Sequence, residues 1–169
     1  MSLEGHLLDK KSLRAITGKT ADWPELAKDC IAFANATGGQ LLLGIEDAEA
    51  EPPAGQRIPA ELPDTLRRKL AERTVNVTAL LDVVTAPNGG QYIALRIPRA
   101  LGVASTTDGH YFLRVADQSK PVTGDDVMRL ANERAALPWE TLTTLNVPRM
   151  QADSAQRDSL LERLRASIG

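Results

Sequence analysis

The sequence contains few cysteines and few aromatic residues, and each shortage excludes a class of protein. Its one cysteine, Cys30, cannot form a disulfide within the chain. This fits a reducing compartment and predicts a cytoplasmic protein. Aromatic residues make up only 4% of the 169 residues, so the core must consist mainly of aliphatic side chains. A broad aromatic platform for stacking single-stranded bases is therefore not expected.

Long apolar runs and a large net charge are also missing. No stretch approaches the roughly 18 apolar residues that indicate a membrane span, and the N-terminus lacks the basic start and apolar run of a signal peptide. The net charge of −2 is not that of a strongly basic DNA-binding protein. Residues 46–64 hold six acidic residues and one basic residue, whereas 65–149 hold eleven basic and eight acidic residues. The basic part suits contact with phosphate, and the acidic part is either a solvated loop or a cation site.

Hydrophobic periodicity and turn residues predict an α+β domain in which helices pack against a mixed β-sheet in two layers. Asp22 and Glu25 form a capping box at the start of the first helix. Asn88-Gly89 is a strong hairpin signal. The expected strands are 7–13 (an edge strand), 40–45, 78–85, 91–97 and 110–115, and the expected helices begin near residues 22, 61 and 123.

The C-terminal part of the sequence predicts a change of organisation. Pro138 is expected to end the third helix, because proline lacks the N–H of the helical ladder. The predicted domains are therefore 1–137, a linker at 138–152 and a terminal helix at 153–169. This last helix either begins a further domain or docks on a partner.

Three features of the first helix and its end have more than one interpretation. Gly38-Gly39 is either a phosphate cradle or a helix stop before a strand, and the stop is the stronger interpretation because no Gly-Lys-Ser/Thr follows. Cys30 lies on the apolar stripe, which favours a core residue over a nucleophile. Asn35 either hydrogen-bonds near a site or caps the end of the helix.

Three stretches of the sequence together resemble the Schlafen AlbA-like family. The opening, Glu4-x-x-x-Leu8-Asp9-x-Lys11, is similar to that family's Glu followed by Glu-Phe-Lys. Residues 32–47, AFANATGGQLLLGIED, resemble its Ala-Phe-Ala-Asn, Gly-Gly, strand, Gly-Ile/Val and Asp signature. Residues 111–122, which contain YFLRV and KPV, are similar to its Tyr-x-x-Arg-Val and Pro-Val ending. The sequence departs from the family at Asp9, where Glu is usual, at Lys10, where an aromatic is common, and at Ala116, where Gly often follows Arg-Val.

The resemblance implies two activities. Bacterial members are described as DNA-binding domains of transcriptional regulators, often ahead of an ATPase-like or winged-helix region. Animal Schlafen relatives include endoribonucleases with three carboxylates, which match Glu4, Asp9 and Asp47 here. If the chain is a nuclease, these residues are both the catalytic and the metal-binding set. They would hold Mg²⁺ or Mn²⁺, which prefer oxygen ligands and activate water. The alternative is that these acids are surface residues or caps.

Basic residues supply the candidate phosphate contacts. For those at 67 and 68 a solvated helix face is an equal alternative, and for the one at 114 a structural salt bridge is. The predicted nucleic-acid-binding residues are Lys11, Arg14, Arg67, Arg68, Arg114 and Lys120.

Three functions therefore remain open from the sequence. The first is a nucleic-acid-binding module, with DNA ahead of RNA, at the N-terminus of a bacterial transcriptional regulator. The second is the metal-dependent nuclease, so whether the chain is an enzyme is undecided. The third is a protein-interaction module whose partner is the downstream region or a second copy in a homodimer. The near-neutral charge favours this third function over strong general DNA binding.

Overall fold

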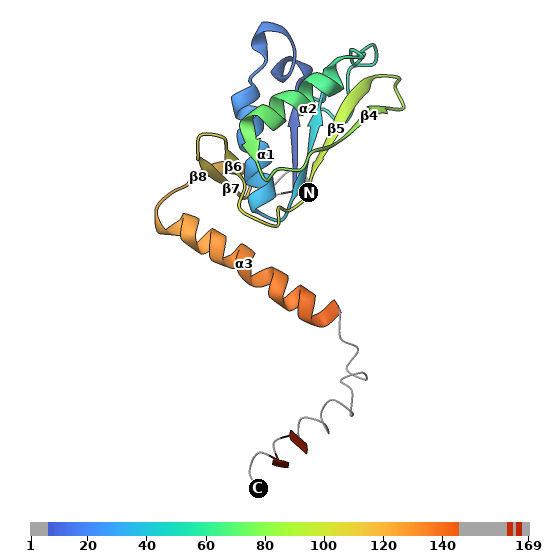
Figure 1. Ribbon diagram of the computed structural model, residues 1–169. Coiled ribbons are helices and arrows are strands. Elements are labelled where there is room, and N and C mark those ends of the chain that lie inside the picture. Colours follow the sequence, from blue (N-terminus) through green and yellow to red (C-terminus); the bar gives the residue numbers. More distant parts are fainter. Residues whose placement is uncertain (1–6, 146–161, 164, 167–169) are drawn as a thin grey trace. The chain divides into compact units, whose positions relative to one another are not determined.

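The computed structural model describes residues 7–145, 162–163 and 165–166 (Figure 1). The chain divides into two compact units, Met1–Ala131 and Asn132–Gly169. All of the described strands belong to the first unit. None of the helices in the described residues is long and apolar enough to cross a membrane.

The main sheet has four strands in the order β1-β2-β5-β4. The strands are β1 (Leu8–Lys11), β2 (Gly39–Leu43), β4 (Leu80–Thr85) and β5 (Gln91–Ile97). β1 pairs with β2 in parallel, and the other pairs are antiparallel. The predicted hairpin is confirmed. Its turn is closed by the Ala86 N–H, which donates to the Gly90 carbonyl at 2.8 Å.

Two helices, α1 (Trp23–Asn35) and α2 (Leu62–Arg73), cover one face of this sheet (Figure 1). The Asp22 carboxylate accepts from the Glu25 N–H at 3.0 Å, so the predicted cap of α1 is confirmed. The core between helices and sheet is mainly aliphatic, as the low aromatic content requires. Its fully buried sheet residues are Leu41, Leu43, Ile93, Leu95 and Ile97. The predicted α+β fold class, with helices packed on a mixed sheet, is thus confirmed.

The remaining strands form two small sheets that the sequence did not predict. They are β3 (Thr74–Val75) with β6 (Ser105–Thr106), and β7 (Tyr111–Val115) with β8 (Gln118–Val122). The strand expected at 110–115 therefore exists as β7, but it pairs with β8 beside α1 rather than within the main sheet. β8 gave no strand signal because it is short, polar and interrupted by Pro121.

The turn between β7 and β8 places Ala116 in the left-handed region, with φ of 55°. Val115 and Gln118 are paired, so Ala116 and Asp117 form a two-residue turn. A side chain in this conformation costs roughly 1–2 kcal/mol, which glycine avoids. The departure from the family's usual glycine is therefore a local source of backbone strain.

Gly38 and Gly39 lie where α1 ends and β2 begins. Gly38 has φ of 83°, and its N–H donates to the Phe33 carbonyl at 2.9 Å, as at a helix C-terminus. A Cβ on Gly39 would overlap the Phe33 ring. Both glycines are therefore explained by the helix stop and by close packing.

The segment between β1 and α1 contains two short 3₁₀ turns, η1 (Leu13–Ala15) and η2 (Gly18–Thr20). The last helix, α3 (Asp125–Leu145), continues through Pro138, so the expected helix end there is wrong. Proline removes only one ladder hydrogen bond, and good helix formers such as Ala, Leu and Glu stand on both sides. Most of the predicted terminal helix lies outside the described residues, and residues 162–163 and 165–166 are helical.

Candidate functional site

A cleft of about 260 Å³ opens where β1 and β2 reach their carboxyl ends. The 3₁₀ turn η1 and the first turn of α1 form its other sides. Two lysines and four carboxylates contribute to its walls, so the lining is acidic on balance. The lining residues are Lys10, Lys11, Ser12, Ala15, Asp22, Glu25, Leu26, Glu46 and Asp47.

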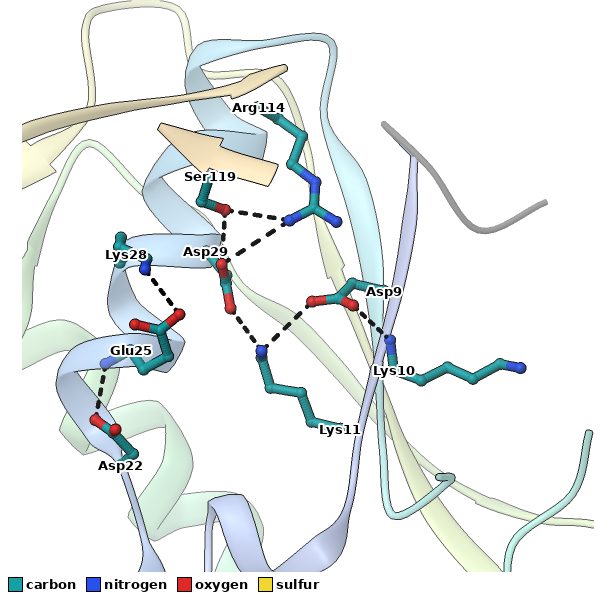
Figure 2. Close-up of polar contacts among 9 residues, drawn as sticks. All are labelled: Asp9, Lys10, Lys11, Asp22, Glu25, Lys28, Asp29, Arg114 and Ser119. Atoms are coloured by element: carbon teal, nitrogen blue, oxygen red, sulfur yellow. Dashed lines mark hydrogen bonds and ion pairs between the residues drawn. The ribbon is translucent and has the colours of Figure 1, made fainter. Parts of the chain in front are cut away.

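Lys11 lines the cleft, and its ammonium points toward the carboxylates of Asp9 and Asp29 (Figure 2). Its Nζ lies 2.8 Å from Oδ2 of Asp29 on α1 and 3.4 Å from Oδ2 of Asp9 on β1. Asp9 and Lys11 are two residues apart on a strand, so both side chains lie on the face toward α1. The Lys11 side chain retains 20% exposure, whereas that of Asp29 retains 4%. The pair therefore spans from the cleft wall to a buried carboxylate.

Asp29 also holds the β7–β8 hairpin (Figure 2). Ser119 Oγ on β8 donates to Asp29 Oδ1 at 2.6 Å, and Arg114 Nη1 on β7 donates to Ser119 Oγ at 3.2 Å. Arg114 Nη1 lies 3.9 Å from Asp29 Oδ1, and its guanidinium stands 4.8 Å from the centre of the Phe33 ring. One buried carboxylate thus joins β1, α1 and β8. We call Asp9, Lys11, Asp29, Arg114 and Ser119 the Asp29 network.

The carboxylates of the Asp29 network shift the pKa of Lys11. Burial lowers the pKa of Lys11, but the hydrogen bond and charge of Asp29, with those of Asp9, outweigh burial and raise it above 10.5. Lys11 therefore stays protonated throughout the neutral range. Burial raises the pKa of the Cys30 thiol on the same helix, and this residue is fully buried. Cys30 is accordingly a core residue, as its place on the apolar stripe suggested.

The predicted phosphate-binding residues are not gathered at one place. Arg14 on η1 follows Lys11 closely and is exposed, and Lys120 on β8 is also exposed. Arg67 and Arg68 lie exposed on α2, where Arg67 Nη1 is 2.9 Å from Asp64 of the same helix. The side chain of Arg114 is only 4% exposed. Its guanidinium faces Asp29 in the interior, which is the salt-bridge role considered as the alternative for it.

The three predicted carboxylates have different positions. Glu4 lies outside the described residues. Asp9 pairs with Lys11, and its Oδ1 accepts from the Lys10 N–H at 3.0 Å. Asp47 is exposed and lines the cleft beside Lys11. Within the part of the chain that the structure describes, no three His, Cys, Asp or Glu residues are grouped closely enough to hold a metal ion.

Asp29, Ser119 and the role of Asn35 were missed in the sequence. Asp29 stands three residues after Leu26 and four before Phe33, which is the spacing of the buried face, so an acid there is a usable signal. Asn35 is buried and is not among the residues that line the cleft. Its amide donates to the carbonyls of Ala104 and Phe112 at 2.8 and 2.9 Å and accepts from the Ala104 N–H at 2.7 Å. These contacts attach the β6–β7 region to the end of α1.

The family model described as Schlafen, AlbA_2 matches residues 4–123. The chain belongs to the Schlafen AlbA_2 family. The match includes β1 with Lys11, the whole of α1 with Asp29, and β8 with Ser119. All described members of the Asp29 network are thus inside the AlbA_2 domain. Membership of this family supports a nucleic-acid-related domain.

Among solved structures, this AlbA_2 chain is similar to the DIP2311 protein from Corynebacterium diphtheriae. The two are 26% identical, with a TM-score of 0.48 over 69% of this chain. The chain covers only 25% of the length of that protein. A search of curated proteins finds no match.

Proposed function

We propose that this domain binds nucleic acid by phosphate contacts on the surface around the cleft, with Lys11 and Arg14 as the first contacts. DNA is the expected ligand ahead of RNA, and the domain would serve as the N-terminal module of a transcriptional regulator. The observation that carries the proposal is the fixed position of the Lys11 ammonium at the cleft wall. Membership of the Schlafen AlbA_2 family supports it.

The fixed ammonium suits a phosphate oxygen for a geometric reason. Lysine has three N–H donors. In Lys11, Asp29 and Asp9 take up two of them, and we assign the third to phosphate. Because the side chain is already held, little rotamer entropy would be lost on binding. Arg14 extends the positive surface outward, since it is exposed on the 3₁₀ turn that follows β1.

The acidic residues of the same cleft favour a second candidate, the metal-dependent nuclease. Glu46 and Asp47 line the cleft with Lys11, and carboxylates alone would repel a phosphodiester. A divalent cation bound beside Asp47 would reverse that repulsion and activate water. In this candidate Glu4, Asp9 and Asp47 would hold Mg²⁺ or Mn²⁺, and Lys11 would stabilise the negative phosphate.

The test is a binding and cleavage series on the full chain. It uses labelled single- and double-stranded DNA and RNA at two salt concentrations, with Mg²⁺, with Mn²⁺ and with chelator. The proposal expects salt-sensitive binding that Arg14→Glu weakens at least about tenfold, which corresponds to about 1.4 kcal/mol. Arg99→Glu, at an exposed arginine after β5, is the matched charge reversal and should have a smaller effect.

Cleavage separates the two candidates. Metal-dependent cleavage that is lost in Asp47→Asn would establish the nuclease, and Asp47 is exposed, so this change should not affect folding. Binding without cleavage in either metal would leave the binding module as the function. Absence of both, even at the lower salt concentration, would contradict the proposal.

A further inference from the structure

The two edges of the main sheet differ in chemistry. β1 forms one edge, and three of its four residues are charged: Asp9, Lys10 and Lys11. β4 forms the other edge, and of its six residues only Asp82 is charged. The figure shows β4 along the border of the sheet (Figure 1). Within the described residues no strand pairs with the outer side of β4.

A mostly apolar edge strand is a liability in a protein that stays monomeric. Unpaired N–H and C=O groups on an edge are a template for another strand, and proteins commonly block them with lysine, proline or a bulge. β4 contains no lysine and no proline, and it pairs with β5 without interruption over all six residues. Leu80 and Val83 are 40% and 46% exposed. In the part of the chain that the structure describes, the outer side of β4 is therefore unpaired, and apolar side chains lie beside it.

We propose that β4 is a homodimer interface, in which two copies of the chain pair their β4 strands antiparallel and form one continuous eight-stranded sheet. A two-fold axis perpendicular to the sheet would relate the copies. Strand pairing across such an axis is closed, because each copy uses the same surface.

The charged β1 edge explains why the partner is a second copy in a closed dimer. Pairing β4 of one copy with β1 of another would build an open-ended fibre. The charges of β1 oppose that arrangement, and the Lys10 ammonium donates to the Glu49 carbonyl at 2.9 Å beside this edge. A molecule with one open edge and one blocked edge stops at the dimer.

The sequence of β4 also selects a register. A two-fold axis perpendicular to the sheet keeps the faces, so even-numbered residues lie opposite even-numbered residues. An axis through Asp82 would place two carboxylates opposite each other, which is unfavourable. An axis through Val83 pairs Val83 with its copy, Asp82 with Val84, and Leu81 with Thr85. This register has no like-charge pair and buries the exposed Val83.

The oligomeric state of the full chain tests the interface. Sedimentation velocity over a range of concentrations should show a monomer–dimer equilibrium, and Val83→Lys should weaken the dimer at least about tenfold, or about 1.4 kcal/mol. Leu101→Lys is the control, because Leu101 is 89% exposed in the loop after β5, and it should leave the dimer unchanged. A wild-type monomer at every concentration overturns the proposal, as does a dimer that Val83→Lys leaves intact.

Cysteine cross-linking tests the register without relying on a lysine in the strand. Residues opposite each other in an antiparallel pair have Cα atoms within the range that a disulfide spans. Under mild oxidation Val83→Cys should give a covalent dimer, whereas Thr85→Cys should not, because position 85 faces position 81 of the other copy. The native Cys30 is fully buried and should not interfere. Equal cross-linking of both variants, or none of Val83→Cys, would contradict the Val83-centred interface.

Discussion

The two edges of the sheet show how one fold can present two different surfaces. β1 is charged, and the Asp29 network attaches it through its inward side chains to α1 and β8. β4 is apolar, and it contacts the rest of the described structure mainly through its hairpin partner β5. Charge at the first edge blocks strand addition and leaves a lysine directed to a cleft. At the second edge Asp82 is the only charged residue of the strand, and among the described residues no strand pairs with its outer backbone groups.

The largest expected effect comes from breaking the Asp29 network at β1. Lys11→Met should lower the free energy of unfolding by about 3 kcal/mol, because it removes the nearest cation from a buried carboxylate. Lys10→Met is the matched control on the same strand, since Lys10 donates to the Glu49 carbonyl and lies away from Asp29. It should cost about 1 kcal/mol or less. Urea denaturation followed by circular dichroism measures both, and equal losses would show that Asp29 does not depend on Lys11.

A smaller loss is expected when the hairpin side of the network is broken. Ser119→Ala removes the donor that lies 2.6 Å from Asp29 Oδ1. A hydrogen bond to a charged group contributes about 1.5–3 kcal/mol, and we expect the lower end because Arg114 remains nearby. The control is Ser12→Ala, at a half-buried serine that forms no side-chain cap on η1. The same urea denaturation measures both variants. If Ser119→Ala leaves the free energy of unfolding unchanged, the contact has no stabilising role.

The pH dependence of the free energy of unfolding should report the contribution of Lys11, which attaches the β1 edge to α1. The pKa of Lys11 is raised in the folded protein above its ordinary value of 10.5. Its contribution is therefore complete below pH 10.5 and is lost as the pH rises through the folded-state pKa. The wild-type free energy of unfolding should fall more steeply above pH 10.5 than that of Lys11→Met. Parallel alkaline profiles would mean that the titration of Lys11 is not linked to folding.

The smallest expected effect is at β4. Val83→Lys should change the free energy of unfolding of the monomer by only about 0.5 kcal/mol, because Val83 is 46% exposed and its side chain can reach water. Thermal unfolding at a concentration too low for dimer formation measures it. A loss as large as that of Lys11→Met would remove the contrast between the edges.

Much of the fold could be predicted because its signals are local. The Asp22–Glu25 cap, the Gly38-Gly39 stop and the Asn88-Gly89 turn each lie within a few residues of the structure they specify. β8 could not be predicted, because a short polar strand depends on its neighbours. The β6–β7 region, which includes the partner strand of β8, is attached to α1 by Asn35. The partners of Asn35, Ala104 and Phe112, lie 69 and 77 residues away in the sequence.

The residues of the candidate site also divide into those found from a local motif and those whose contacts are distant in the sequence. Lys11 and Asp9 were found from a motif that lies on one strand. Asp29 had a local signal in its place on the buried face of α1, but its contact with Ser119 spans 90 residues, and no local pattern reports that contact. Arg114 donates to Ser119 and lies near Asp29, so its interior position depends on the same distant contact. The strain at Ala116 was visible in the sequence only as a departure from the family's glycine, and its φ of 55° supplies the physical reason.

The central claim is that nucleic acid binds at the β1 edge and not at the β4 edge. Hydrogen–deuterium exchange of the full chain, with and without the nucleic acid that binds best, tests it directly. The account predicts added protection in residues 8–20, which hold β1, η1 and η2, and no change in residues 80–85. Protection confined to residues 80–85, or absent from residues 8–20 at saturating ligand, would contradict it.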